Sequence, residues 1–314
     1  MRWEDGRESD NVEDVRGEGG GGGFGGLGGG GGGLGGLIGL LPLLMGGGGG
    51  GLVILVIVGL LFFGGPILRS ITGGGEQRAP SGYQGDARSA ANGGRTAAND
   101  PQAQDLRFTR VVAAYTEDTW GELFQERGAR YTPAKFKVYS DAYTTACGQG
   151  SAEMGPFYCP GDRTVYLDLN FFRELSGKFG APGRFAQAYV IAHEVGHHVQ
   201  NLEGTMDRRE RGGLSGSRNQ QSVRTELQAD CYAGVWANRT NRDKQVIEAG
   251  DLESGLRAAT AVGDDTLQRQ ARGRVVPDSF THGSSEQRVR WFRTGFEAGD
   301  PARCDTFSPG YGAL

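Results

Sequence analysis

Apolar residues recur three or four positions apart in three stretches beyond residue 104: DLRFTRVVAAYTEDTWGELFQERG, APGRFAQAYVIAHEVGHHVQNLEG and VRTELQADCYAGVWANR. This period places them on one face of a helix, so each stretch predicts a helix. Short runs rich in β-branched and aromatic residues, KFKVYS, FYC and TVYLDL, lie between the first two and predict strands. The stretch NFFRELSGKFG predicts one further short helix.

The order helix, small sheet, helices predicts one α+β domain over residues 105–307, followed by a tail at 308–314. Before residue 105 the sequence shows no such spacing of apolar residues. Residues 1–51 are charged at first and then rich in glycine, so they offer too little apolar surface to offset the entropy of ordering, and we expect disorder. Residues 69–104 are mostly small or polar and predict a flexible linker.

One strongly apolar segment, LVILVIVGLLFFGGPIL, occupies residues 52–68. A bilayer core is spanned by about 17–25 such residues, so the segment predicts a single transmembrane anchor. A signal peptide has a shorter apolar core closer to the N-terminus, and a buried core helix would need amphipathic partners that the flanking glycine tracts do not supply. Arginines flank both sides of the segment, so the positive-inside rule leaves its orientation open.

Charge and cysteine content narrow the class of protein. The net charge is −4 with scattered Lys and Arg, which disfavours nucleic acid as a partner. Cys147 and Cys159 flank a short loop that a disulfide closes readily, and Cys231 with Cys304 is the remaining pair. Two disulfides indicate an oxidising compartment and so a domain outside the cytoplasm, the alternative being free buried thiols.

Three of the four histidines fall within the stretch HEVGHH. His193 and His197 are four residues apart, so on a helix both imidazoles face the same side and can bind one zinc ion. Glu194 lies one position from His193, where its carboxylate can contact a water at that ion. His198 lies off this face, and we expect it to pack or to support a ligand. The pattern predicts one Zn²⁺ per chain.

A catalytic zinc site takes a third protein ligand and keeps one position open. Glu226 and Asp230 are four apart on the third predicted helix, among apolar neighbours where carboxylates need a partner. We expect Glu226 to be the third ligand and Asp230 to hydrogen-bond a ligand histidine, with Asp230 as the alternative ligand. His282 precedes a capping box of Ser284 and Gln287, and is either a surface turn residue or an oxyanion donor in the cleft.

HEVGHHVQ followed by ELQADCYAGVW resembles the bacterial neutral zinc metallopeptidase family, which consists of membrane-anchored proteins of zincin type. The resemblance covers most of residues 108–307, including CGQGSAEMGPFYCPGDRTVYLDL and THGSSEQRVRWF, and the glycine-rich N-terminus with one apolar segment is similar too. It implies a zincin-like metallopeptidase domain that acts on peptides or proteins, with zinc ligands at His193, His197 and Glu226.

These residues suggest an endopeptidase in which Glu194 is the general base. TVYLDL, as an edge strand, would hold an extended substrate by strand addition. A zinc-dependent amidase acting on cell-wall peptides would use almost the same chemistry. The alternative from another class is an envelope scaffold or binding protein with a structural zinc, which requires four protein ligands and no open position.

Overall fold

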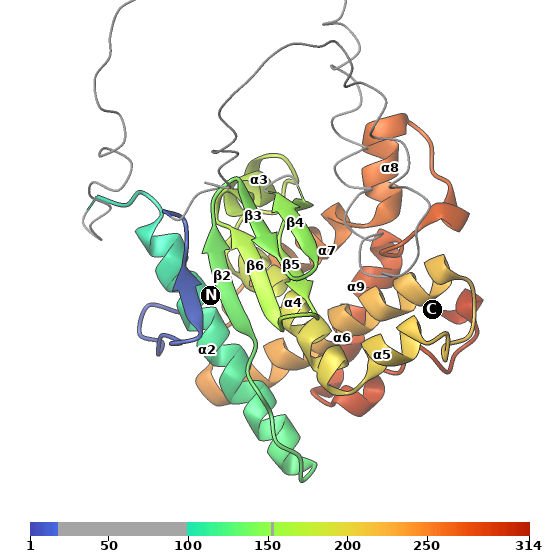
Figure 1. The fold of residues 1–314 in the computed structure, drawn as a ribbon, viewed down its shortest axis with the longest axis horizontal. Coiled ribbons are helices and arrows are strands. Elements are labelled where there is room, and N and C mark those ends of the chain that lie inside the picture. Colours follow the sequence, from blue (N-terminus) through green and yellow to red (C-terminus); the bar gives the residue numbers. More distant parts are fainter. Residues whose placement is uncertain (18–98, 152–153) are drawn as a thin grey trace, which may run out of the picture.

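A computed structural model describes residues 1–17, 99–151 and 154–314 of the chain (Figure 1). The predicted anchor at residues 52–68, with the glycine-rich tract and most of the predicted linker, lies outside the described residues. Among the helices that are described, none is long and apolar enough to cross a membrane.

The described part is of the α+β class, as predicted. A four-stranded sheet has the order β1-β2-β6-β5, and β3 and β4 form a separate hairpin. β2 pairs in parallel with both β1 and β6, whereas β5 is antiparallel to β6. The strands are β1 (Val12–Asp14), β2 (Lys135–Tyr139), β3 (Ala142–Thr145), β4 (Gly148–Ser151), β5 (Phe157–Cys159) and β6 (Thr164–Asp168).

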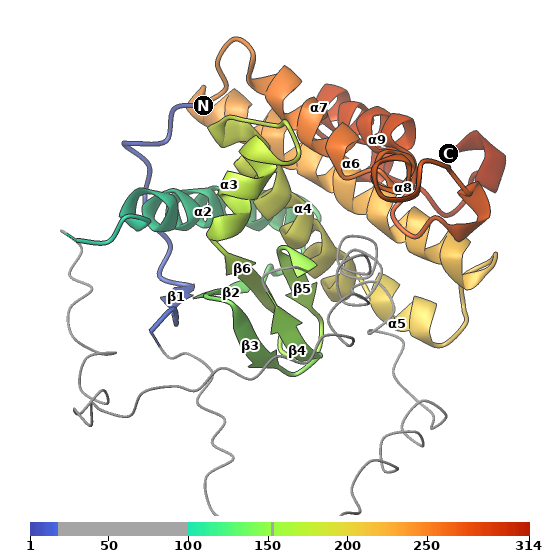
Figure 2. The ribbon, with the colours of Figure 1, turned by 90° about the horizontal axis from the view of Figure 1, so that it is seen from above.

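Each of the four predicted helical stretches forms a helix, on α2, α3, α4 and α6. Figure 2 shows α4 between the sheet on one side and α6, α7 and α9 on the other. The helices are α2 (Ala103–Glu126), α3 (Asn170–Gly177), α4 (Arg184–Leu202), α5 (Thr205–Glu210), α6 (Arg218–Lys244), α7 (Asp251–Ala261), α8 (Asp264–Arg272) and α9 (Ser285–Ala298), with short 3-10 turns at Pro277–Ser279, Pro301–Arg303 and Tyr311–Ala313.

The expectation that TVYLDL forms an edge strand is wrong. Its residues form β6, which pairs with β2 on one side and with β5 on the other. All five β6 residues are buried, as is typical of an interior strand covered on both faces. The edge strand near α4 is therefore β5, the FYC run.

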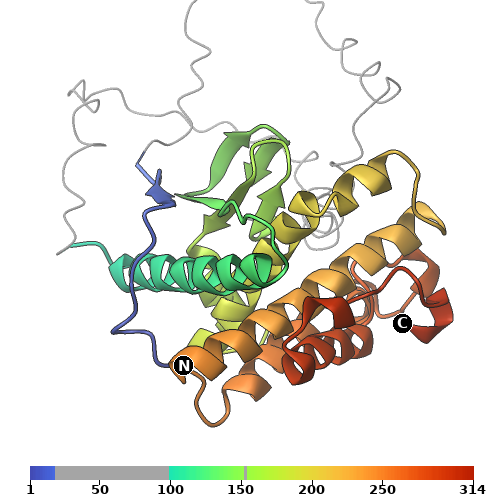
Figure 3. The same ribbon diagram turned by 90° about the horizontal axis from the view of Figure 1, so that it is seen from below.

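The prediction of disorder is wrong for residues 1–17, which belong to the folded domain. Val12 pairs with Phe136 in the β1–β2 ladder, and Trp3 is only 6% exposed. The Trp3 ring packs edge-on against Phe108, with 5.4 Å between ring centroids. Figure 3 shows the segment crossing α2 before it enters the sheet. The segment is polar on average, but buried Trp3 and Val12 and the backbone pairing of β1 with β2 hold it in a defined conformation.

The C-terminal boundary also differs from the prediction of a tail at 308–314. Leu314 is buried, and Tyr311–Ala313 forms a 3-10 turn. The Arg224 guanidinium on α6 donates to the Pro309 carbonyl at 2.8 Å, which fixes the segment to the domain. The folded domain thus continues to the last residue, and at its other end α2 begins within the predicted linker.

Both predicted disulfides are present, Cys147–Cys159 and Cys231–Cys304. The first ties the β3–β4 hairpin to β5. The second ties the middle of α6 to the chain that follows α9, and both of its cysteines are fully buried. The described residues contain no free cysteine.

Replacing Trp3 by alanine should lower the free energy of unfolding of the whole domain. Truncation of a buried aromatic side chain typically costs about 3–5 kcal/mol. Urea unfolding followed by circular dichroism measures the change, and Asp10→Ala, at an exposed position of the same segment, is the matched control. Equal midpoints for wild type and Trp3→Ala would show that the segment does not contribute to the core.

Candidate metal centre

The two histidines of the HEVGH stretch face the same side of α4, as their spacing predicts. His193 is buried, the His197 side chain is 12% exposed, and their ring centroids are 4.7 Å apart. Gly196, between them, lies against α6. A Cβ atom at Gly196 would stand 3.0 Å from the carbonyl oxygen of Ala229, so glycine permits the close approach of the two helices.

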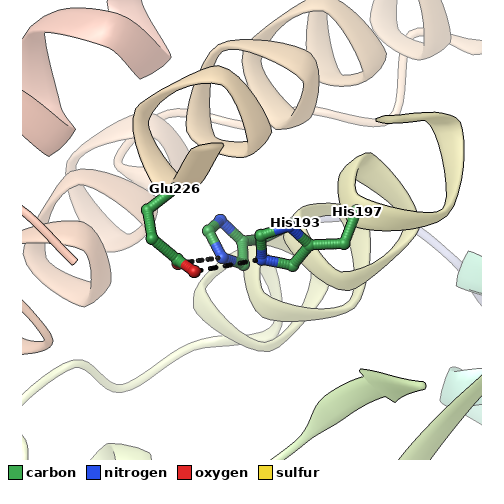
Figure 4. Close-up of side chains that lie close together, drawn as sticks. All are labelled: His193, His197 and Glu226. Carbon is green, nitrogen blue, oxygen red and sulfur yellow. Dashed lines mark hydrogen bonds and ion pairs between the residues drawn. The ribbon is translucent and has the colours of Figure 1, made fainter. Parts of the chain in front are cut away.

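This approach brings Glu226 of α6 to the histidines (Figure 4). Its Oε2 is 3.2 Å from His193 Nε2, and its Oε1 is 3.6 Å from His197 Nε2. One ligand atom from each of the three residues lies within 4.8 Å of the others. Two imidazole nitrogens and one carboxylate oxygen are a donor set that suits zinc and leaves a coordination position open. The residues present therefore fit the ion that the sequence predicts.

Asp230 supports His193 and does not join the group of three. Its Oδ1 lies 2.9 Å from His193 Nδ1, the ring nitrogen that faces away from Glu226. The Tyr189 hydroxyl donates to the same oxygen at 2.5 Å. Arg288 of α9 donates to Asp230 through Nε at 2.8 Å and through Nη2 at 2.9 Å. These bonds fix the orientation of the His193 ring and leave Nε2 for a metal ion.

The charges at this site shift the pKa values of its members. Burial alone would lower the pKa of His193, but the Asp230 carboxylate, with help from Glu226, raises it to about 9. Burial would raise the pKa of Glu226, yet the neighbouring His197 and His193 hold it well below its ordinary range. Burial would likewise raise the pKa of Asp230, and Arg288 reverses the shift. The negative charge of these carboxylates favours the protonated form of His193.

His197 is oriented by a second set of contacts. Its Nδ1 lies 2.9 Å from Gln200 Oε1, and the amide nitrogen of Gln200 donates to the Thr225 carbonyl and to Gln228. Gln200 thus links α4 to α6 next to Glu226. His198 faces elsewhere, as predicted: its Nδ1 lies 3.0 Å from the Tyr158 hydroxyl, and its Nε2 lies 2.7 Å from the Thr132 carbonyl.

Glu194 is buried beside the histidines and is not one of the three clustered ligands. Burial raises the pKa of its carboxyl, while the nearby charges of His193 and His197 oppose that shift. The backbone amide of Tyr158, on edge strand β5, also acts to lower this pKa and therefore faces the carboxylate. Glu194 thus lies close to the two candidate histidine ligands and to edge strand β5.

His282 lies next to the site and not on an open surface turn. Its side chain is 15% exposed, and Nδ1 is 3.1 Å from Asp264 Oδ1. The other oxygen of Asp264 accepts the backbone N–H groups of Thr281, His282 and Gly283. Burial lowers the pKa of His282, but Asp264 and the nearby Glu226 outweigh it and raise it. The capping box of Ser284 and Gln287 that starts α9 is confirmed.

Sequence reasoning did not find the partners that hold the predicted residues in place. Arg288, Tyr189, Gln200 and Asp264 come from three helices, α9, α4 and α8, and none belongs to a motif that marks a metal site. One signal was available for Arg288: it lies on the same face of α9 as the apolar Trp291 and Phe292, where a charge needs a buried partner.

Comparison with known proteins agrees with this geometry. Residues 1–307 match the family described as "Putative neutral zinc metallopeptidase". The chain belongs to this family. It is 46% identical over 310 residues to the protein YpfJ of Escherichia coli K12, covering 98% of this chain and 99% of the relative. It is 44% identical over 214 residues to Rv2575 of Mycobacterium tuberculosis, covering 64% of this chain and 72% of that relative.

Both relatives are described as uncharacterized proteins, so the comparison gives the family and no substrate. No solved structure matches the chain. The match to the family begins at residue 1, which agrees with the inclusion of the N-terminal segment in the fold.

Purified wild-type protein should bind about one zinc ion per chain, because the described residues supply one set of three ligands. His193→Ala and His197→Ala each remove a ligand and should lose the metal. His198→Gln is the matched control: it changes the adjacent histidine and should retain zinc, although the domain loses some stability. Metal analysis of the dialysed proteins tests this, and full zinc occupancy in a His193→Ala, His197→Ala double variant contradicts the assignment.

Proposed function

We propose that this chain is a zinc-dependent peptidase in which His193, His197 and Glu226 hold the ion and Glu194 is the general base. The observation that carries the proposal is the convergence of three ligand atoms within 4.8 Å beside a buried carboxylate that is not among them. Zinc, when bound, would polarise the scissile carbonyl and lower the pKa of a water molecule. The remaining steps depend on residues of this chain.

Glu194 would accept the proton of the attacking water at its carboxylate and pass it to the leaving amine. Its position supports this role, because it adjoins both the histidines and the backbone of Tyr158. β5 is a terminal strand of the sheet, and an extended peptide paired with its outer edge would bring its scissile bond to this carboxylate. The proposed substrate strand thus lies on β5 and not on β6.

His282 would stabilise the developing oxyanion. The Asp264 carboxylate accepts from Nδ1–H, so Nε2 can donate only when the ring is doubly protonated, the form that the raised pKa of His282 favours. Glu226 contributes to the raised pKa of His282, which supports a position of that ring close to the candidate ligands. Oxyanion stabilisation requires a hydrogen-bond donor that is already positioned where the negative charge develops on the substrate oxygen.

A structural zinc is the competing proposal, and one observation counts against it. Such a site needs a fourth protein ligand, and Asp230 is the nearest candidate from the sequence. Asp230 already accepts hydrogen bonds from the Tyr189 hydroxyl and from Nε and Nη2 of Arg288. The described residues thus provide three ligand atoms, as a catalytic site requires. Endopeptidase action and amidase action on cell-wall peptides would use the same residues.

The two disulfides favour an oxidising compartment for the domain, so we place the peptidase outside the cytoplasm. The apolar segment at residues 52–68 would attach it to the membrane.

Glu194→Gln should abolish most cleavage while zinc remains bound. Glutamine keeps the shape of the side chain but cannot accept the proton of the water, and general-base assistance is typically worth about 10²–10⁴-fold. Turnover of a peptide library and zinc content are measured on the same preparations, with Glu226→Ala as the variant that should lose the metal itself. Cleavage by Glu194→Gln at the wild-type rate would refute the mechanism, and a wild type that binds zinc but cleaves nothing would favour a structural ion.

His282→Asn should lower turnover with little change in zinc content, because the ring is a hydrogen-bond donor and not a ligand. Loss of one oxyanion donor typically costs about 10²–10³ in turnover. Ser279→Ala, at an exposed position in the same loop, is the control for disturbance of that loop. Unchanged turnover in His282→Asn would remove this residue from the mechanism.

A further inference from the structure

The N-terminal segment, residues 1–17, is built into the same folded body as the C-terminal domain. Val12–Asp14 forms a parallel ladder with β2, and the ladder continues where Val15 N–H donates to the Val138 carbonyl at 2.9 Å. Earlier in the segment, the Ser9 amide donates to the Arg110 carbonyl of α2 at 3.1 Å. Strand pairing and core burial together make the segment part of the domain.

The two ends of the chain that connects this segment to α2 meet at one point. Arg16 forms an ion pair with Asp100, with 2.7 Å between Nη2 and Oδ2. The same guanidinium donates to Gln102 Oε1 at 3.1 Å, and its side chain is only 1% exposed. A buried arginine requires such partners, because an unpaired buried charge is costly. The chain therefore leaves the domain at residue 17 and returns to it at residue 99, beside the point of departure.

This closure conflicts with a single membrane crossing at residues 52–68. One crossing would place residues 1–17 on one face of the bilayer and residues 99–314 on the other. A β ladder and a buried ion pair cannot join groups that a hydrocarbon layer about 30 Å thick separates. The conflict remains if residues 1–17 of one chain pack on residues 99–314 of a second copy. Both copies would have residues 99–314 on the same face of the bilayer, and residues 1–17 would still lie on the opposite face.

We propose that residues 1–17 and 99–314 lie on the same face of the membrane, outside the cytoplasm. This replaces the single-pass topology expected from the sequence. The compartment follows from the two disulfides, whereas the shared face follows from the contacts of Arg16, Trp3 and β1. The inference does not rest on the proposed peptidase activity.

Cysteine labelling of the full chain in intact bacterial cells tests the topology. All four native cysteines are in disulfides, so the wild type provides an unlabelled background. Asp10→Cys reports on the N-terminal segment, and Arg274→Cys reports on the domain, both at exposed positions. A membrane-impermeant maleimide is applied before and after lysis. We expect both variants to be labelled to equal extents before lysis, with no increase on lysis.

Labelling of one variant before lysis and of the other only afterwards would overturn the proposal, because the two parts would then lie on opposite faces. Labelling of both only after lysis would overturn the placement outside the cytoplasm. Asp5→Cys and Arg272→Cys, also exposed, form a second pair if either first variant fails to accumulate. Trp3→Asp combined with Asp10→Cys is a further control, because the added charge disrupts the docking of residues 1–17. It should increase proteolysis of the domain only if residues 1–17 and 99–314 lie on the same face of the membrane.

Discussion

The close crossing of α4 and α6 at Gly196 is the constraint on which the site depends. The HEVGH histidines lie on α4 and Glu226 lies on α6, and the three ligand atoms meet where the two helices approach so closely that a Cβ atom at Gly196 would be crowded. The same requirement recurs one layer further out. A Cβ at Gly234 of α6 would meet the Phe292 backbone of α9 at 2.1 Å, which shows that these helices also touch backbone to backbone. Gly196 and Gly234 thus allow α4, α6 and α9 to pack closely against one another in turn.

This stacking brings charges into the interior that hydrophobic packing alone would exclude. Glu194, Glu226 and Asp230 are buried, and the buried guanidinium of Arg288 offsets one of these carboxylates. Burying an uncompensated charge is expensive, so the remaining negative charge requires a cation. The Asp230 carboxylate raises the pKa of His193, so a proton on that ring would supply part of it. A divalent ion held by the two histidines and Glu226 would balance the site without that proton.

Local periodicity explains which features the sequence could predict. The spacing of His193 and His197 fixes their common face once the helix forms, and Glu226 with Asp230 follows the same rule on α6. The contacts of Arg288 and Asp264 depend on how distant helices pack, which no local pattern encodes. The role of Trp3 was missed for a related reason. The average composition of residues 1–17 is polar and predicts disorder, but one buried indole packed against Phe108 is enough to anchor the segment. The edge position of β5 depends on pairing order, which neither FYC nor TVYLDL specifies.

The docked N-terminal segment also bears on where a peptide could bind. A sheet with open edges invites strand addition at either one. Here β1 is the outermost strand beyond β2, so the segment provides that edge, and β5 is the edge on the side of α4. The Cys147–Cys159 bridge fixes β5 to the neighbouring hairpin, next to Tyr158 and the Glu194 carboxylate. The strand edge closest to the candidate chemistry is thus held by a covalent bond, and the opposite edge is formed by the N-terminal segment.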